Sequence, residues 1–369
     1  MASSLIVEVC KIKEIIPHNN ADTLEIAVVK GWECIVRKGL YKVGDIVVYI
    51  PVDSILPTEL ADRIGVRNYL KGKNNDRVGC ARLRGEMSYG LIINNENNWE
   101  EGEDVKEFYK ITKYEPPIRV TAGDAAPEDP LFEKFTDIEN IRNFPDVFEE
   151  GEMVALTEKV DGTSCRNGWE IKDESDWDDN GSIEWKSGSH KVKRKKPSEE
   201  EMKNNTYWYP YHISAVNKLL VHLLTEKKAK KMATLYGEIY GRIRGGHKSM
   251  HYGKPNSLNY AAFALNIDGH YVDWKVFEKY CNEFEVPMVP LIDIIPFNME
   301  KIKELSKGKS YLASSNNTDH IREGVVVCPL KERTAFNIGR VILKVINPDY
   351  LLMKNKNEEK GEVVDFKDE

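Results

Sequence analysis

A proline-rich break constrains the fold of this chain more than any other single feature. Pro116-Pro117 and the stretch Ala125-Ala126-Pro127-Glu128-Asp129-Pro130 lack hydrophobic periodicity, as expected of a connector between domains. At 369 residues the chain is also longer than one typical domain. We therefore predict two domains, residues 1–110 and 131–369, joined by a linker over residues 111–130.

The first domain is predicted to be a small all-β barrel. Apolar and polar residues alternate from Leu5 to Ile12, and later apolar runs, divided by glycine and proline, cover residues 24–29, 32–36, 46–50 and 90–93. About five short strands with this punctuation are typical of an OB-type barrel. Such barrels bind single-stranded nucleic acid through a basic face that also carries aromatic side chains.

Two interpretations of the barrel's basic and aromatic residues stay open. The side chains that could contact RNA are Trp32, Arg37, Lys38, Arg82 and Arg84. Alternatively, Trp32 belongs to the core and the arginines form a solvated edge. Residues 17–24 also resemble the opening of tRNA-binding OB modules.

Composition narrows the class of protein. The net charge of −7 excludes a polycation, so nucleic-acid binding would depend on local basic patches. Neither an apolar run of membrane-spanning length nor a signal peptide is apparent, so we expect no membrane association. The cysteines form no C-x-x-C pair, which argues against a zinc site or a disulfide scaffold and predicts an intracellular, reducing compartment; they are Cys10, Cys34, Cys80, Cys165, Cys281 and Cys328.

The first candidate for chemistry lies in residues 157–164, Thr-Glu-Lys-Val-Asp-Gly-Thr-Ser. The preceding apolar run predicts a strand that ends in a turn at Gly162. Lys159 could act as a nucleophile if a nearby positive charge or a metal lowers its pKa. Asp161 would share a face with Lys159 and could hold a metal through water. A lone Lys-x-Asp-Gly equally describes an exposed turn, so the later segments decide.

Residues 135–228 combine helical signals with a basic run. We predict a short helix over residues 135–148, a capping box formed by Ser198 and Glu201, and an amphipathic helix over residues 212–228. The basic run from Lys186 to Lys196 is either a solvated loop or a nuclear-import signal, or it faces a phosphate. We favour the phosphate-facing loop because it follows Lys159 closely.

Four later apolar strands each carry charged or aromatic side chains. They cover residues 235–241, 260–268, 322–327 and 341–346, and their distinctive residues are Glu238, Phe263, Asp268, Glu323 and Lys344. A carboxylate at a strand end commonly faces water. Lys344 within an apolar strand is harder to explain, because a buried cation needs a partner such as a polyphosphate.

In this order and spacing, the segments resemble the covalent nucleotidyltransferase superfamily of polynucleotide ligases and capping enzymes. The matching motifs are Lys159-Val160-Asp161-Gly162, Tyr236-Gly237-Glu238, Phe263 to Asp268, Glu323-Gly324 and Leu343-Lys344. The barrel precedes the first motif, and Val345 to Glu369 is too short for another one. This arrangement resembles the Deinococcus- and Naegleria-type RNA ligases. It implies an N-terminal all-β OB-type barrel and an α+β nucleotidyltransferase, or adenylation, domain with antiparallel sheets.

The resemblance also implies roles for individual residues. Lys159 would form a lysyl-AMP, and Lys344 would contact the phosphates. The residues implied to bind ATP or AMP are Glu158 at the adenine edge, Glu238 at the ribose, Phe263 stacked on adenine, and Gly162, Glu323 and Lys344. Mg²⁺ or Mn²⁺ would be held, through water, by Asp161, Glu323 and Asp268.

Two departures from the family pattern concern phosphate binding. Many RNA ligases have a second lysine two residues after the motif V lysine, and Ile346 stands there instead. Residues 187–191 occupy the region of motif Ia, so the phosphate or RNA contact is left open among His190, Lys191 and Arg194.

The expected function is therefore an ATP-dependent RNA ligase that seals 3′-OH and 5′-phosphate ends. Its partner would be RNA, as a nicked duplex or an RNA–DNA hybrid, and the protein would be a monomer. One alternative is an mRNA capping-type guanylyltransferase that uses GTP. The other is a non-catalytic RNA-binding protein with a relic transferase domain.

Overall fold

The computed structural model describes residues 5–72, 74–114, 124–172, 183–202, 205–226, 228–241, 257–314 and 320–359. Its contacts divide the chain into two units. Unit 1 comprises Met1–Pro117, Asp137–Phe148 and Val345–Asp365, and unit 2 comprises Ile118–Thr136, Glu149–Lys344 and Phe366–Glu369. Two segments that the sequence assigned to the second domain are thus grouped with the first.

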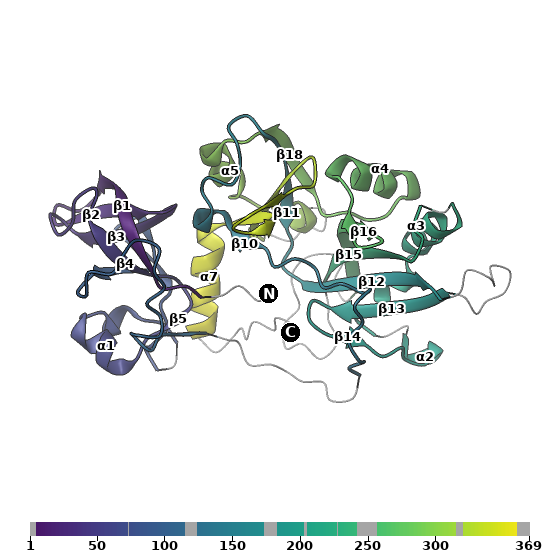
Figure 1. Cartoon of the computed structure of the whole chain (residues 1–369), viewed down its shortest axis with the longest axis horizontal. Coiled ribbons are helices and arrows are strands. Elements are labelled where there is room, and N and C mark those ends of the chain that lie inside the picture. Colours follow the sequence, from purple (N-terminus) through teal and green to yellow (C-terminus); the bar gives the residue numbers. More distant parts are fainter. Residues whose placement is uncertain are drawn as a thin grey trace. The chain divides into compact units, whose positions relative to one another are not determined.

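Unit 1 is built on a five-stranded antiparallel sheet in the order β3-β2-β1-β4-β8 (Figure 1). The strands are β1 (Glu8–Pro17), β2 (Leu24–Val29), β3 (Trp32–Arg37), β4 (Ile46–Ile50) and β8 (Leu91–Asn94). β1 pairs with both β2 and β4, and its register shifts between Ile12 and Glu14. A long irregular strand shared by two partners lets the sheet curl, as the predicted OB-type barrel requires.

Short elements complete unit 1. They are β5 (Ser54–Ile55) paired with β9 (Thr112–Lys113), β6 (Cys80–Leu83) paired with β7 (Glu86–Tyr89), α1 (Thr58–Arg63), a 3-10 turn at Arg67–Tyr69 and α7 (Pro348–Glu359). The sequence did not predict α7. On its first turn, Asp349 accepts a hydrogen bond of 2.8 Å from Arg82.

Trp32 is a core residue of unit 1. It is buried, its ring stacks on Tyr49 with a centroid distance of 6.1 Å, and its Nε1 donates to Asn143 Oδ1 at 2.8 Å. The interpretation of Trp32 as core is therefore the one that the structure supports. Arg37, Lys38 and Arg84 are exposed, so they stay available as RNA contacts.

The helix predicted over residues 135–148 is wrong. This stretch contains only β10 (Glu139–Asn140) and a 3-10 turn at Ile141–Asn143. The Asn140 side chain accepts a hydrogen bond from the Arg142 amide and so caps this single turn. The Arg142 carbonyl accepts from the Gly31 amide at 3.1 Å, which ties the turn to the barrel instead of to a further helical turn.

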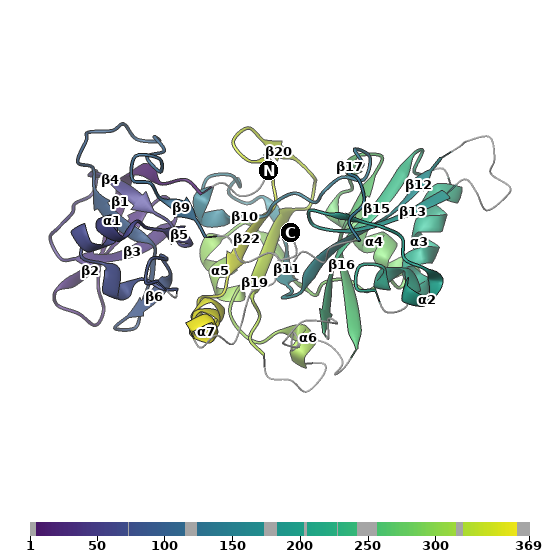
Figure 2. The ribbon, with the colours of Figure 1, turned by 90° about the horizontal axis from the view of Figure 1, so that it is seen from below.

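Unit 2 contains a six-stranded antiparallel sheet in the order β14-β13-β12-β15-β16-β17 (Figure 2). The strands are β12 (Thr163–Ile171), β13 (Ile183–Ser189), β14 (Lys193–Arg194), β15 (Met232–Gly241), β16 (Leu258–Ile267) and β17 (His270–Tyr271). β15 and β16 confirm the strands predicted over residues 235–241 and 260–268. β12 and β13 were not predicted.

A second antiparallel sheet carries β11 (Met153–Lys159) between β18 (Leu291–Pro296) and β19 (Gly324–Pro329). β22 (Leu343–Ile346) lies beside β19, and the hairpin of β20 (Thr334–Ala335) and β21 (Gly339–Arg340) connects them. The predicted strands that carry Lys159, Glu323 and Lys344 thus belong to one sheet.

Helices cover unit 2. They are α2 (Glu199–Met202), α3 (Ser214–Thr225), α4 (Trp274–Phe284), α5 (Met299–Leu305), α6 (Tyr311–Ser314) and a 3-10 turn at Tyr209–His212. α3 confirms the predicted amphipathic helix, and the buried side chains are Val216, Leu219, Leu220, Leu223 and Leu224. Ser198 and Glu201 form the predicted capping box before α2. Within the described parts of the chain, none of the helices combines the length and apolar character that crossing a bilayer requires.

Candidate active site

Lys159 and Glu323 meet at the end of two neighbouring strands. Lys159 is the last residue of β11, and its strand partner is Gly324, the first residue of β19. Glu323 directly precedes that glycine, so its carboxylate reaches the lysine, and the distance from Lys159 Nζ to Glu323 Oε2 is 2.7 Å. Both side chains are mostly buried, with exposures of 25% and 15%.

A tight turn brings the second sheet to the same lysine. After Val160 and Asp161 the chain enters β12, where Ser164 pairs with Glu238 of β15. A Cβ at Gly162 would lie 2.4 Å from the Ile239 carbonyl oxygen and 2.6 Å from Glu238 Cγ. Any side chain at position 162 would therefore push Glu238 away from Lys159, which explains the glycine.

The electrostatics of this cluster keep Lys159 protonated. Burial alone would lower its pKa, but the charges of Glu323 and Glu238, the hydrogen bond to Glu323 and the charge of Asp161 together raise it above the ordinary lysine value. Burial raises the pKa of Glu238 to about 8; Glu323 and Asp161 contribute to the rise, against the opposing charge of Lys159. The site therefore carries excess negative potential, which a cation would relieve.

Glu158 points away from this cluster into a separate buried environment. Its Oε2 accepts a hydrogen bond of 2.8 Å from the Tyr311 amide, whereas its Oε1 is buried and has no hydrogen-bond partner among the described residues. Burial raises the pKa of Glu158, although the Ser310 hydroxyl, the Tyr311 amide and Arg322 oppose the rise. A buried acceptor without a donor is unfavourable by about 1–3 kcal/mol, so Oε1 is suited to receive a donor from a ligand.

A β-bulge sets the place of Phe263. Tyr236 pairs with Ala264 and Gly237 with Ala262, so Phe263 is an extra residue without a partner in β15. Bulges of this kind redirect side chains and occur beside active sites. The Phe263 ring is half-buried and packs against a cluster that includes Val160 and Ala261. It thus lies close to the turn that follows Lys159.

Three other predicted site residues lie on elements near the same lysine. Lys344 is half-buried on β22, in the same sheet as Lys159. His190 and Lys191 lie in the turn between β13 and β14. Because Cys165 pairs with both Ser189 and Gly237, this turn lies at the same end of the sheet as Glu238.

Two predicted assignments do not fit their surroundings. Asp268 accepts hydrogen bonds from the amides of Lys230, Lys231 and Met232, which lower its pKa although burial opposes them. Met232 opens β15, and at about 3.3 Å per residue this end lies roughly 20 Å from Glu238. Asp268 therefore caps a turn and is no metal ligand of this site.

Arg194 is the other assignment to correct. Its guanidinium is buried, Nη1 lies 2.8 Å from Asp124 Oδ1, and its Cζ lies 4.6 Å from the centre of the Tyr207 ring. An arginine with these partners holds protein segments together and is not a phosphate contact. Among the described residues, no group of three or more His, Cys, Asp and Glu side chains could hold a metal ion directly. The water-mediated roles of Asp161 and Glu323 stay predictions.

Sequence reasoning missed Arg166 and misjudged Lys186. Arg166 is fully buried, its Nε donates to the Ser189 carbonyl at 3.1 Å, and Nη1 donates to the Phe132 carbonyl. Lys186 begins the basic run but is only 1% exposed and pairs with Asp129 and Glu170. The signal that could have indicated a buried role for Arg166 was its charge within residues 163–171, which form a strand. Nothing local distinguishes Lys186 from its solvated neighbours.

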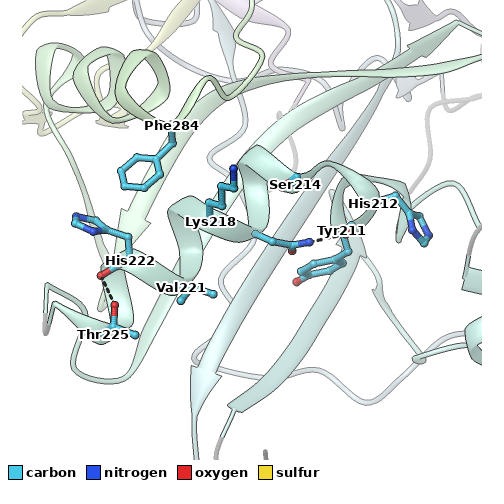
Figure 3. A pocket seen from close by; sticks show the side chains of 9 residues that line it. Tyr211, His212, Ser214, Lys218, Val221, His222, Thr225 and Phe284 are labelled. Atoms are coloured by element: carbon cyan, nitrogen blue, oxygen red, sulfur yellow. Dashed lines mark hydrogen bonds between the residues drawn. The ribbon is translucent and has the colours of Figure 1, made fainter.

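A cavity of about 740 Å³ lies elsewhere, beside α3 (Figure 3). Its lining includes His212, Lys218 and His222, and the Phe284 ring reaches it from α4 at a centroid distance of 4.8 Å from His222. The cavity is wide open to solvent. None of the residues that surround Lys159 lines this cavity, so the cavity is a feature separate from the lysine cluster.

The fold and the site together define a class of protein. Three features together are typical of a ligase that works through a covalent intermediate. They are an OB-type barrel, two antiparallel sheets in an α+β domain, and a lysine at a strand end among carboxylates. A family model described as RNA ligase matches residues 152–346, and a model described as an OB-fold domain matches residues 6–94. The chain belongs to the RNA ligase family.

Solved structures agree with this assignment. A variant of the Naegleria gruberi RNA ligase with ATP and Mn shares 24% identity and a TM-score of 0.72, over 95% of this chain and 100% of that chain. The same ligase with PPi shares 23% identity and a TM-score of 0.71, over 96% and 99% of the two chains. An apo variant of a Naegleria gruberi RNA ligase shares 25% identity and a TM-score of 0.71, over 95% and 99%. Among curated proteins, none matches the chain.

Proposed function

We propose that this protein is an ATP-dependent RNA ligase that joins a 3′-OH end to a 5′-phosphate end through a lysyl-AMP. The observation that carries the proposal is the placement of Lys159, 2.7 Å from Glu323 at the end of β11 and within the electrostatic reach of Glu238 and Asp161. A purely structural ion pair needs no second and third carboxylate. The excess of acidic groups suits a lysine whose protonation changes during a reaction.

The residues around Lys159 fit an adenine nucleotide. The unpartnered Oε1 of Glu158 is a buried acceptor that suits the exocyclic amine of adenine. Phe263, which packs near Val160, offers an aromatic ring on which adenine can stack. Glu238 can accept hydrogen bonds from the ribose hydroxyls. The structures of the Naegleria gruberi ligase with ATP and Mn, with AMP and Mn, and with PPi support this choice of nucleotide.

The carboxylates also fit a divalent cation. We infer that Asp161 and Glu323 hold Mg²⁺ or Mn²⁺ through water molecules, since Mg²⁺ keeps several waters in protein sites. Its chemical contribution is to offset the negative charge that otherwise keeps Lys159 protonated, and so to lower the pKa of that amine.

In the first step, neutral Lys159 Nζ attacks the α-phosphorus of ATP. A P–N bond forms and Nζ releases one proton to water. The bond from the α-phosphorus to the bridging oxygen breaks, and pyrophosphate leaves with that electron pair. The negative charge on the phosphate oxygens would be stabilised by Lys344 and by one of His190 and Lys191. Glu238 and Phe263 keep the nucleoside in place during the attack.

The two later steps transfer the AMP and close the strand. An oxygen of an RNA 5′-phosphate attacks the AMP phosphorus, and the P–N bond breaks to restore Lys159. The 3′-hydroxyl of the neighbouring RNA end then attacks the 5′-phosphorus, loses its proton, and AMP leaves. RNA, as a nicked duplex or an RNA–DNA hybrid, is the proposed partner, and we propose a monomer in an intracellular, reducing compartment.

The test is covalent labelling. Purified protein, first treated with pyrophosphate to remove any resident AMP, is incubated with Mg²⁺ and α-labelled ATP, beside Lys159→Ala. We expect label on the denatured wild-type chain and none on the variant. Label from GTP alone would indicate a capping-type guanylyltransferase. No label from either nucleotide on folded protein would leave the non-catalytic RNA-binding alternative.

A further inference from the structure

Residues 124–136, called the strap here, cross unit 2 without forming a helix or a regular strand. Part of the strap belongs to the predicted linker, yet its backbone is attached to the six-stranded sheet. The Ala126 amide donates to the Lys193 carbonyl at 2.8 Å, and the Lys195 amide donates to the Asp124 carbonyl at 2.6 Å. These bonds extend the sheet beyond β14 and fix the beginning of the strap.

Ion pairs hold the strap against the strands β13 and β14. Asp129 pairs with Lys186 and, at 3.1 Å, with Lys193, while Asp124 pairs with Arg194 at 2.8 Å. Lys186 also lies 2.5 Å from Glu170 on β12, so its charge is shared between the strap and the sheet. A fully buried cation with two carboxylate partners holds its geometry firmly, because separating any partner leaves an uncompensated charge.

Close packing fixes the following residues. Phe132 is 1% exposed, and a Cβ at Gly168 would lie 3.0 Å from its ring, so the ring rests directly on the backbone of β12. Arg166 donates to the Phe132 carbonyl, and Tyr236 donates from its hydroxyl to the Glu133 carbonyl at 2.9 Å. The strap therefore follows the same sheet face as Tyr236 and Glu238.

The strap ends by inserting Phe135 into an aromatic group. Its ring is 6% exposed and packs edge to face against Phe263, with a centroid distance of 4.8 Å and an interplanar angle of 67°. Tyr236 lies at 5.1 Å and Tyr271 at 5.6 Å, and the Arg340 guanidinium stands 5.0 Å from the Phe135 centroid. Phe135 is thus enclosed on several sides, whereas Phe263 is only half-buried.

We propose that Phe135 is a positioning residue for ATP binding: the strap holds its ring against Phe263 and so fixes the plane that Phe263 presents to adenine. The proposal rests on the proposed function. As the extra residue of a bulge, Phe263 lacks the cross-strand partner that usually limits a side chain. Its orientation therefore depends on the neighbours that contact it, and the Phe135 ring is one such neighbour, at a centroid distance of 4.8 Å.

The expected effect falls on nucleotide affinity and not on the chemical step. Phe135 touches none of the reacting atoms, and an edge-to-face aromatic pair contributes about 0.5–1.5 kcal/mol beyond its buried area. That free energy corresponds to a change of roughly 2- to 12-fold in the KM for ATP. The maximal rate of lysine adenylylation should stay within about twofold of the wild type.

The experiment measures single-turnover lysine labelling against ATP concentration, for full-length protein cleared with pyrophosphate. We expect Phe135→Leu to raise the KM for ATP as stated, and Phe135→Tyr, which keeps the ring, to restore it. Phe132→Leu is the matched control: it loosens the same strap and lowers the melting temperature, but it does not alter the ring beside Phe263. If Phe135→Leu does not fold, Phe135→Met takes its place with the same expectation.

Each outcome has one meaning. An unchanged KM for ATP in folded Phe135→Leu or Phe135→Met overturns the proposal, and so does a lower maximal rate at constant KM. An equal rise of KM in Phe132→Leu would assign the effect to the strap's packing and overturn the role of Phe135. Absence of label from the wild type itself would instead contradict the proposed function, so the two failures are distinguishable.

Discussion

Lys159 Nζ and Glu323 Oε2 lie 2.7 Å apart, although 164 positions separate the two residues in the chain. The antiparallel pairing of β11 with β19 creates this contact, because Lys159 is opposite Gly324. The lysine is consequently held as an ammonium group by the same carboxylates that would organise its reaction. Its reactivity therefore depends on the removal of a proton.

The rate of adenylylation should increase with pH. The pKa of Lys159 is raised by Glu323 and Glu238 against the effect of burial, so the neutral, attacking form is scarce near neutrality. Below that pKa, each pH unit multiplies the neutral fraction by about ten. We expect the rate of labelling at fixed low metal concentration to rise between about pH 6 and pH 8. A rate independent of pH would show that Lys159 is already neutral.

Glu238→Gln should stabilise the nucleotide-free protein at alkaline pH. The pKa of Glu238 is raised to about 8 in the folded state by burial, above its ordinary value of 4.5. Folding therefore disfavours the ionised form, and stability decreases as pH rises from about 4.5 to 8. The glutamine is always neutral, so the melting temperature of the variant should match the wild type near pH 4 and exceed it at pH 8. The corresponding difference in the free energy of unfolding at pH 8 is at most about 5 kcal/mol. Equal melting temperatures at both pH values would contradict this.

Gly162→Ala should disable adenylylation without unfolding the protein. The new methyl group would meet the Ile239 carbonyl oxygen at 2.4 Å and Glu238 Cγ at 2.6 Å, and would separate Glu238 from Lys159. Displacements of about 1 Å can lower rates by about 100-fold, and we expect a loss of that order in the labelling assay. Gly39→Ala is the control: it has a φ of +75° but no atom within 4 Å, so it should reduce stability only modestly and leave labelling intact.

Lys186→Met should destabilise unit 2 strongly. It removes the buried partner that Asp129 and Glu170 share, which is expected to lower the free energy of unfolding in urea denaturation by up to about 3–5 kcal/mol. Lys193 and Lys172 remain paired with the two carboxylates and reduce the loss. Lys193→Met should have a smaller effect, because the Lys193 side chain is more exposed and lies 3.1 Å from Asp129. Equal effects of the two variants would argue against the special role of Lys186.

The ion pair between Asp129 and Lys186 should also make the stability of the folded protein sensitive to acid. Hydrogen bonds from Lys186 and Lys193 lower the pKa of Asp129, although burial opposes them. A carboxyl with a lowered pKa contributes stability above its unfolded-state value of 3.8, and that stability is lost as pH falls through the folded-state pKa. Asp129→Asn should accordingly flatten the acid limb of the stability curve.

Glu158→Gln should weaken the preference for ATP over GTP. Oε2 of Glu158 accepts from the Tyr311 amide, so the glutamine should keep its oxygen there and place its amide group at the Oε1 position. A donor at that position would repel the amine of adenine and suit the carbonyl oxygen of guanine. We expect the KM for ATP to rise about tenfold or more while the ratio of GTP to ATP labelling increases. An unchanged ratio would show that Glu158 does not read the base.

Local patterns in the sequence determined much of the fold. β2 and β4 begin and end at the predicted residues, because apolar runs bounded by glycine and proline leave few other conformations. The amphipathic helix was also predicted, although α3 is shorter than the predicted range, because its periodic leucines define one buried face. The strands carrying Lys159, Glu238, Glu323 and Lys344 were also predicted, since each is a short apolar run with a distinctive charge.

Tertiary structure alone decided which charged residues are available for chemistry. Lys186 and Arg194 belong to a basic run, yet burial against Asp129 and Asp124 makes them structural, and Asp268 is satisfied by three amides. The bulge that turns Phe263 and the vacant acceptor on Glu158 likewise arise from contacts distant in sequence. The periodicity of apolar residues indicates which face of a helix or strand is buried. The ion-pair or hydrogen-bond partner of a charged side chain depends on how the sheets pack. The sequence by itself therefore determined β2, β4, most of α3 and the strand that carries Lys159, and packing decided which side chains surround that lysine.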